Sequence, residues 1–150
     1  MAIPLLDSLD LTDKDITADA LLTQRKVASY LVDQRHAHYH FTVKANQPTL
    51  LDDLTLFFQD RKQPDFVMLD PPDHGRIETR NIWTTTELNG YLNFPHVAQA
   101  FAIERLTIDK KTAKPTRDIA YGITSRPPAQ ADARRLLEIN RGHWTIENSC

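Results

Sequence analysis

Apolar and polar positions along the chain change their spacing several times, and each change predicts a new element. Residues 14–19 form a short run with strand character, and over residues 20–35 the apolar side chains recur at helical spacing. Residues 38–46 are rich in aromatic and β-branched residues, which favours a second strand. The proline that opens residues 48–58 suits the first turn of a second helix. This order predicts a parallel α/β unit with a right-handed crossover.

The second half of the chain has a different pattern. Residues 63–76 are predicted to be a loop because prolines and a glycine interrupt them. Residues 76–87 alternate between apolar and polar, and residues 100–125 form two further strand-like runs joined by a basic loop. A helix returns from Gln130. The sequence therefore predicts a small antiparallel block between the parallel unit and a C-terminal helix.

Composition narrows the class of protein. The 150 residues suit one domain, and 41% hydrophobic with 25% charged residues is an ordinary globular balance. One cysteine, Cys150, excludes an internal disulfide. No apolar run approaches the roughly 18 residues of a membrane span, and the first residues lack a basic segment typical of a signal peptide. We expect a cytoplasmic protein without a membrane partner.

The charge is unevenly distributed. The formal net charge is −2, but residues 105–143 carry 9 Lys/Arg and 4 Asp/Glu, whereas residues 1–70 carry 7 Lys/Arg and 11 Asp/Glu. An asymmetry of this kind indicates either a surface that faces a polyanion or simply a solvated face.

Two carboxylates lie where a charge is costly. Asp19 follows the first predicted strand, where it is either the N-cap of the next helix or a metal ligand at a strand end. On the C-terminal helix, Glu147 shares one stripe with Leu136, Asn140 and Trp144. A carboxylate on a stripe that begins as core must be paired, protonated or metal-bound. Two such carboxylates that converge would suit Mg²⁺.

Four motifs suggest a family. "ITADALLTQ", "FTVKANQPTLL", "HGRIETR" and "RGHWTIENS", in this order and spacing, closely resemble the DDE transposases of bacterial insertion sequences, and most of all their H-repeat-associated group. The resemblance covers nearly the whole chain. It implies a ribonuclease-H-like fold with a β-rich insertion before the last catalytic helix, so that residues 1–150 form one partial catalytic domain and residues 72–128 approximate the insertion.

The resemblance also implies a chemistry. It carries the second catalytic Asp of the family onto Asp19 and the catalytic Glu onto Glu147, where both hold divalent metal, Mg²⁺ or Mn²⁺, for cleavage and transfer of DNA strands. The implied partner is DNA, at transposon ends and target. Self-association or binding to an intact transposase is a further expectation.

The sequence departs from this family at its start and its end. The family's first catalytic Asp lies on a strand well upstream of the second, whereas only 18 residues precede Asp19 and none of the acids among them lies on such a strand. The chain also ends three residues after Glu147. We therefore expect an internal segment of a transposase that is inactive alone. The alternative is a non-catalytic product that binds transposase or DNA, as an inhibitor or an inert remnant.

Several polar residues are candidates for contacts with the DNA backbone. Each also has a structural interpretation, such as helix capping for the first three or an ion-paired strand face for the arginines of "HGRIETR". The candidates are Lys44, Asn46, Gln47, Arg76, Arg80, Arg141 and His143.

Two expectations concern the strands of the parallel unit. His36, His38 and His40 alternate and could bind metal, but no acid completes the set in the sequence, so a surface turn is the preferred interpretation. Without the upstream strands of a ribonuclease-H-like sheet, the strand at residues 15–19 should become an edge with nothing charged to block pairing.

Overall fold

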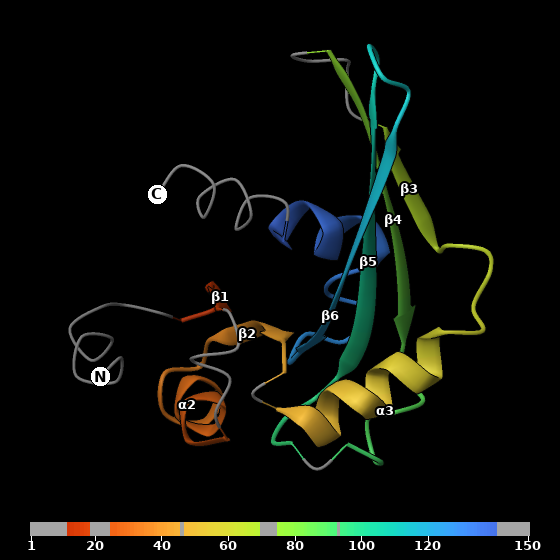
Figure 1. Cartoon of the computed structure of the whole chain (residues 1–150). Coiled ribbons are helices and arrows are strands. Elements are labelled where there is room, and N and C mark those ends of the chain that lie inside the picture. The colour runs from red at the N-terminus through yellow and green to blue at the C-terminus, as the bar shows by residue number, and fades with distance from the viewer. Residues whose placement is uncertain (1–11, 19–24, 46, 70–74, 93, 141–150) are drawn as a thin grey trace.

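The computed structural model describes residues 12–18, 25–45, 47–69, 75–92 and 94–140. Its centre is one six-stranded sheet with the order β1-β2-β6-β5-β4-β3, shown in Figure 1. The predicted mixed α/β class is confirmed. Within the described ranges, no helix is long and apolar enough to cross a membrane.

The predicted parallel unit is present. β1 (Asp15–Ala18) pairs in parallel with β2 (His38–Val43), and Ile16 lies opposite Tyr39. Between the two strands, α2 (Arg25–Ser29) continues directly into the π-helical turn η1 (Tyr30–Gln34). Because the pairing is parallel, the carboxyl ends of both strands lie at the same edge of the sheet.

The second predicted helix is α3 (Pro48–Phe58), with proline in its first turn. Pro48 suits this position because the first amide groups of a helix have no intrahelical partner to lose. Leu54 and Phe58 are the buried residues of α3, four positions apart on one stripe.

The antiparallel block is also present, with one element that the sequence analysis missed. β4 (Arg76–Thr85), β5 (Gln99–Asp109) and β6 (Pro115–Thr124) pair antiparallel in this order. The prediction of a loop over residues 63–76 was wrong, because β3 (Phe66–Leu69) pairs with β4 inside that range. Four apolar residues between prolines are too short a run to show an alternation.

The block is continuous with the parallel unit rather than a separate layer. β6 pairs antiparallel with β2, with Phe41 opposite Ile123. In Figure 1 the outer halves of β4, β5 and β6 extend beyond the helices as a long twisted ribbon that ends in the turn at residues 110–114. The range 72–128 therefore contains strands whose inner ends belong to the main sheet.

Each face of the sheet has its own hydrophobic core. On one face, Tyr39 and Phe41 of β2 pack with Leu31 of η1 and Leu54 of α3. On the other face, the helix at residues 133–140 contributes buried residues that pack with β4 and β5: Leu136 and Leu137 contact Ile82, Phe101 and Ile103. The α2 and α3 helices thus cover one face, and the C-terminal helix covers the other.

Gly122 of β6 permits close packing in the centre of the sheet. A Cβ atom at this position would lie 2.2 Å from Cζ of Phe101 and 2.8 Å from the carbonyl oxygen of Phe41. Because no side chain stands there, the Phe101 ring lies directly over β6. The backbone of Gly122 is not in the left-handed region, so its conformation does not require glycine. The requirement is for space.

β1 lies at one end of the sheet order among the described strands, as expected for this segment. Its residues Asp15 to Thr17 are only partly buried, and Ala18 is buried. The expectation that nothing charged blocks further pairing at this edge stays a prediction. Asp15 at the start of the strand is held in a network of ionic contacts described below.

Candidate nucleic-acid interface at the carboxyl edge of the sheet

The two predicted metal ligands, Asp19 and Glu147, lie outside the described residues. The strand that precedes Asp19, β1, is nevertheless among the described residues. β1 ends at Ala18 and β2 ends at Val43, and because these strands are parallel, the segments that follow them leave the same edge of the sheet. In open α/β sheets this is the edge at which ligands bind.

A cavity of about 510 Å³ opens at this edge. The beginning of α3, the beginning of α2 and the loop between β4 and β5 surround it, and Figure 1 shows these three segments at the same end of the molecule. Its volume lies within the usual range for small-molecule sites, roughly 300–1,000 Å³. Its lining consists of Arg25, Gln47, Pro48, Thr49, Leu50, Asp53, Tyr91 and Phe94.

Aromatic and charged groups alternate around this cavity. The Tyr91 ring is 67% exposed, and its hydroxyl lies 3.4 Å from Oδ1 of Asp53. The guanidinium carbon of Arg25 lies 5.9 Å from the ring centre of Phe94. Sequence analysis singled out none of these four residues, because no spacing in the chain links α2, α3 and the loop after β4.

Of the polar residues predicted after β2, Gln47 lines the cavity and Lys44 is exposed. Gln47 occupies the N-cap position of α3, but its side chain makes no capping hydrogen bond. Helix capping therefore does not explain Gln47. Asn46 lies outside the described residues.

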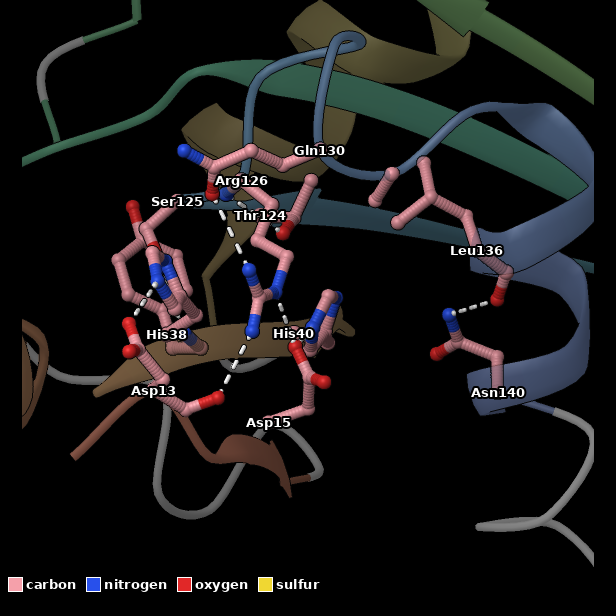
Figure 2. Close-up of polar contacts among 12 residues, drawn as sticks. Asp13, Asp15, His38, His40, Thr124, Ser125, Arg126, Gln130, Leu136 and Asn140 are labelled. Carbon is pink, nitrogen blue, oxygen red and sulfur yellow. Dashed lines mark hydrogen bonds and ion pairs between the residues drawn. The ribbon is translucent and has the colours of Figure 1, made fainter. Parts of the chain in front are cut away.

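A partly buried ionic network lies on the face of β1 and β2 opposite the aromatic core. Figure 2 shows the Arg126 guanidinium between Asp13 and Asp15, with His38 and His40 on either side. Asp15 Oδ1 accepts hydrogen bonds from Nε of Arg126 at 2.5 Å and from Nε2 of His40 at 2.8 Å. The His38 ring lies 3.8 Å from Asp13. The network joins β1, β2 and the segment after β6.

Arg126 is the centre of this network. Its Nη2 donates to the carbonyl oxygen of Asp13 at 2.8 Å, and its Nη1 donates to the side chain of Gln130 at 3.1 Å. Gln130 lies just before the C-terminal helix. The arginine therefore connects the edge strand β1 to the segment that leads into that helix.

The pKa values follow from this arrangement. Burial alone would raise the pKa of Asp15, but the hydrogen bonds from Arg126 and His40 outweigh it and hold the pKa below its ordinary value. Burial lowers the pKa of His40, and the Asp15 carboxylate offsets this only in part. His40 is therefore neutral near pH 7, with Nε2–H donating to Asp15. Its Nδ1 is buried and has no partner within the described part of the chain.

The interpretation of the alternating histidines as a surface turn was wrong for His38 and His40. Both lie on β2, and His40 is 0% exposed. The acids that complete the set are Asp15, which lies opposite His38 on the neighbouring strand, and Asp13, in the turn before that strand. The sequence does contain two acids spaced two residues apart and two histidines spaced two residues apart, which is the strand period. Their proximity in space depends on the parallel pairing of the two segments.

Three arginines of the outer ribbon, Arg80, Arg105 and Arg117, are paired with acids. Arg80 is 7% exposed, and its guanidinium lies 3.2 Å from Glu78, so the ion-paired strand face describes this residue. Arg76 is exposed at the end of β4. A groove of about 350 Å³ runs along this face of the ribbon, and acids such as Asp109 and Asp118 line it together with the basic residues.

The last candidates, Arg141 and His143, lie outside the described residues. The helix at residues 133–140, which precedes them, packs on the sheet. Asn140 is 2% exposed, and its Nδ2 donates to the carbonyl oxygen of Leu136 at 2.8 Å. In the described part of the chain, no group of three or more His, Cys, Asp or Glu side chains could hold a metal ion. Arg126 supplies the cation of the Asp13–Asp15 network.

Comparison with known proteins gives one partial match. A curated protein of Xanthobacter autotrophicus, described as "Uncharacterized protein in dhlA 3'region", is 37% identical over 92 residues, which are 59% of this chain and 31% of that protein. The chain thus spans about a third of the length of this relative. No protein-family model matches the chain, and no solved structure matches it.

Proposed function

We propose that this chain is a segment of the catalytic domain of a DDE-type DNA transposase, with a ribonuclease-H-like arrangement of its sheet. In this proposal Asp19 and Glu147 are two of the three acidic residues of the site. The four motifs carry only two of the three acids onto this chain, and we expect strand cleavage to require all three.

One observation carries the proposal beyond the four sequence motifs. β1 and β2 are parallel, and the helix at residues 133–140 packs on the same sheet through Leu136 and Leu137. The strand before Asp19 and the helix before Glu147 therefore belong to one packed unit. The Arg126 network adds a direct link between β1 and the segment that leads into that helix.

In this function the residues of the chain position a DNA strand at the carboxyl edge. A bound Mg²⁺ or Mn²⁺ would be held by Asp19 and Glu147, and would activate the attacking oxygen and stabilise the leaving oxygen. Lys44, Gln47 and Arg25 stand at this edge and would contact phosphates. Arg76, at the end of the ribbon, would add a more distant backbone contact.

Chemical cross-linking tests the central geometry. With Cys150→Ser as background, Asp19→Cys combined with Glu147→Cys should give a high yield of intramolecular product with a short bis-maleimide. The control pair is Asp52→Cys with Glu147→Cys, because Asp52 is exposed on α3, on the other face of the sheet. Equal yields in both pairs, or no product in the first, would contradict the proposal.

DNA binding tests the assignment of the partner. Fluorescence anisotropy with duplex DNA should show weak, sequence-independent binding that falls steeply with salt, because released counterions drive it. Arg76→Ala should reduce the salt slope by about one. Gln63→Ala, a change of an exposed uncharged residue before β3 and outside the cavity lining, is the control and should leave the slope unchanged. Absence of binding at low salt would favour an inert remnant.

A further inference from the structure

We propose that the cavity at the carboxyl edge binds an unpaired nucleotide of a single DNA strand, with the base stacked on Tyr91. This inference rests on the proposed function, since it names the form of DNA that the site takes. It concerns the cavity of about 510 Å³ between α2, α3 and the loop after β4.

The aromatic lining argues for a planar ligand. Tyr91 exposes 67% of its surface at the mouth of the cavity, while Phe94 is 8% exposed in its wall. Bases stack on exposed aromatic rings whatever their identity. The contact between the Tyr91 hydroxyl and Asp53 restrains the ring at the mouth.

The polar lining suits the remaining parts of a nucleotide. Arg25 is the one basic group in the described lining, and its guanidinium lies beside Phe94, where it would meet the phosphate of a base stacked at the mouth. The Asp53 carboxylate accepts hydrogen bonds, and the Gln47 amide both donates and accepts. These groups match the edge of a base whose Watson–Crick partner is absent.

Duplex DNA does not fit this lining. Its bases are stacked on one another and paired, so that a ring at the mouth of a cavity meets only sugar and phosphate. Arg25 and Asp53 bring one charge of each sign, so the cavity itself offers little net attraction to a duplex backbone. The cavity therefore favours a strand whose bases are already unpaired.

Fluorescence anisotropy with the full chain tests this inference, using a labelled 12-nucleotide single strand and a hairpin duplex of the same composition. Tyr91→Ala should weaken binding of the single strand about tenfold and change binding of the duplex less than about twofold. Tyr91→Phe should retain single-strand binding, because the ring remains. Leu56→Ala, a change of a 62% exposed residue on α3 outside the cavity lining, should have no effect on either probe.

The outcomes separate this inference from the proposed function. If Tyr91→Ala leaves single-strand binding unchanged while the chain still binds DNA, the nucleotide site is wrong and the proposed function stands. If the chain binds neither probe at low salt, both are wrong. The thermal melting temperature of Tyr91→Ala should match that of the wild type, since the side chain is exposed and outside the core.

Discussion

β4, β5 and β6 each have an inner half in the main sheet and an outer half in the twisted ribbon. The two halves differ in burial and in the contacts that stabilise them. The first five residues of β5 are buried and lie between two helical layers, whereas the next six are partly exposed or exposed. On β6 the order is reversed, because the strand returns from the exposed end into the core. Backbone pairing continues without interruption through both halves.

This difference shows what stabilises each half. The inner half is held by apolar contacts with the helices on both faces. The outer half is held by the hydrogen-bond ladder and by ion pairs, such as those of Arg105 with Asp118 and Arg117 with Glu104. Surface ion pairs contribute little, so the outer half should tolerate substitutions that the inner half does not.

The largest expected effect is from truncating one isoleucine in each half of β5. Ile103 is 1% exposed and packs under the C-terminal helix, whereas Ile108 is 42% exposed. Ile103→Ala should lower the free energy of unfolding by about 3 kcal/mol, since it leaves a cavity in the core. Ile108→Ala should lower it by less than about 1 kcal/mol. Urea denaturation measures both, and equal losses would show that the two halves are equally packed.

The next largest loss of stability is expected from replacing a glycine of the central sheet with alanine. Gly122→Ala places a methyl group against the Phe101 ring and the Phe41 carbonyl oxygen, so the ring must move, at a cost of about 2–3 kcal/mol. Gly90→Ala is the matched control, because nothing lies within 4 Å of the added atom. A shift in melting temperature for Gly90→Ala as large as that for Gly122→Ala would contradict this account of β6.

Removing one carboxylate charge from the network at β1, or one from the outer half of β6, has a smaller effect. Asp15→Asn weakens the contact with Arg126 and should lower the free energy of unfolding by about 1–2 kcal/mol. Asp118→Asn breaks the more exposed ion pair with Arg105 and should change stability by less than about 0.5 kcal/mol. Chemical denaturation measures both losses, and an equal loss from the more exposed pair of Asp118 would contradict the expected difference.

The smallest effect concerns pH. Because the pKa of His40 is lowered in the folded protein, the unfolded chain takes up a proton first as the pH falls below about 6.5. Stability should therefore be full above that value and decrease as the pH falls below it. Asp15, whose pKa is also lowered, contributes a further loss only near and below 3.8.

Melting temperatures at about pH 7.5 and about pH 5.5 measure this dependence. His40→Gln removes the titrating group and should flatten the change between the two conditions. His96→Gln is the control, because His96 is partly exposed and pairs with Asp33 at the surface. An undiminished pH dependence in His40→Gln would assign it to other groups, such as His38, whose pKa burial also lowers.

Sequence by itself determined the elements with a strong local pattern. The strand periods of β1, β2 and β4, the proline at the start of α3 and the two runs of β5 and β6 are all local signals, and each is confirmed. β3 was missed because its run of four residues is short, and its pairing with β4 and the packing of Phe66 and Met68 against the core are tertiary contacts. The four motifs likewise gave the resemblance to a transposase family, which remains a prediction.

Only the tertiary structure decided which side chains meet. Arg126 and Asp15 are 111 positions apart, and no spacing in the chain predicts their hydrogen bond. The acids that complete the histidine pair come from a parallel neighbour and the turn before it, and the cavity at the carboxyl edge combines three segments from different parts of the chain. Periodicity reports which face of an element is buried, whereas the partners across that face depend on strand order and register, which are set only when the whole sheet assembles.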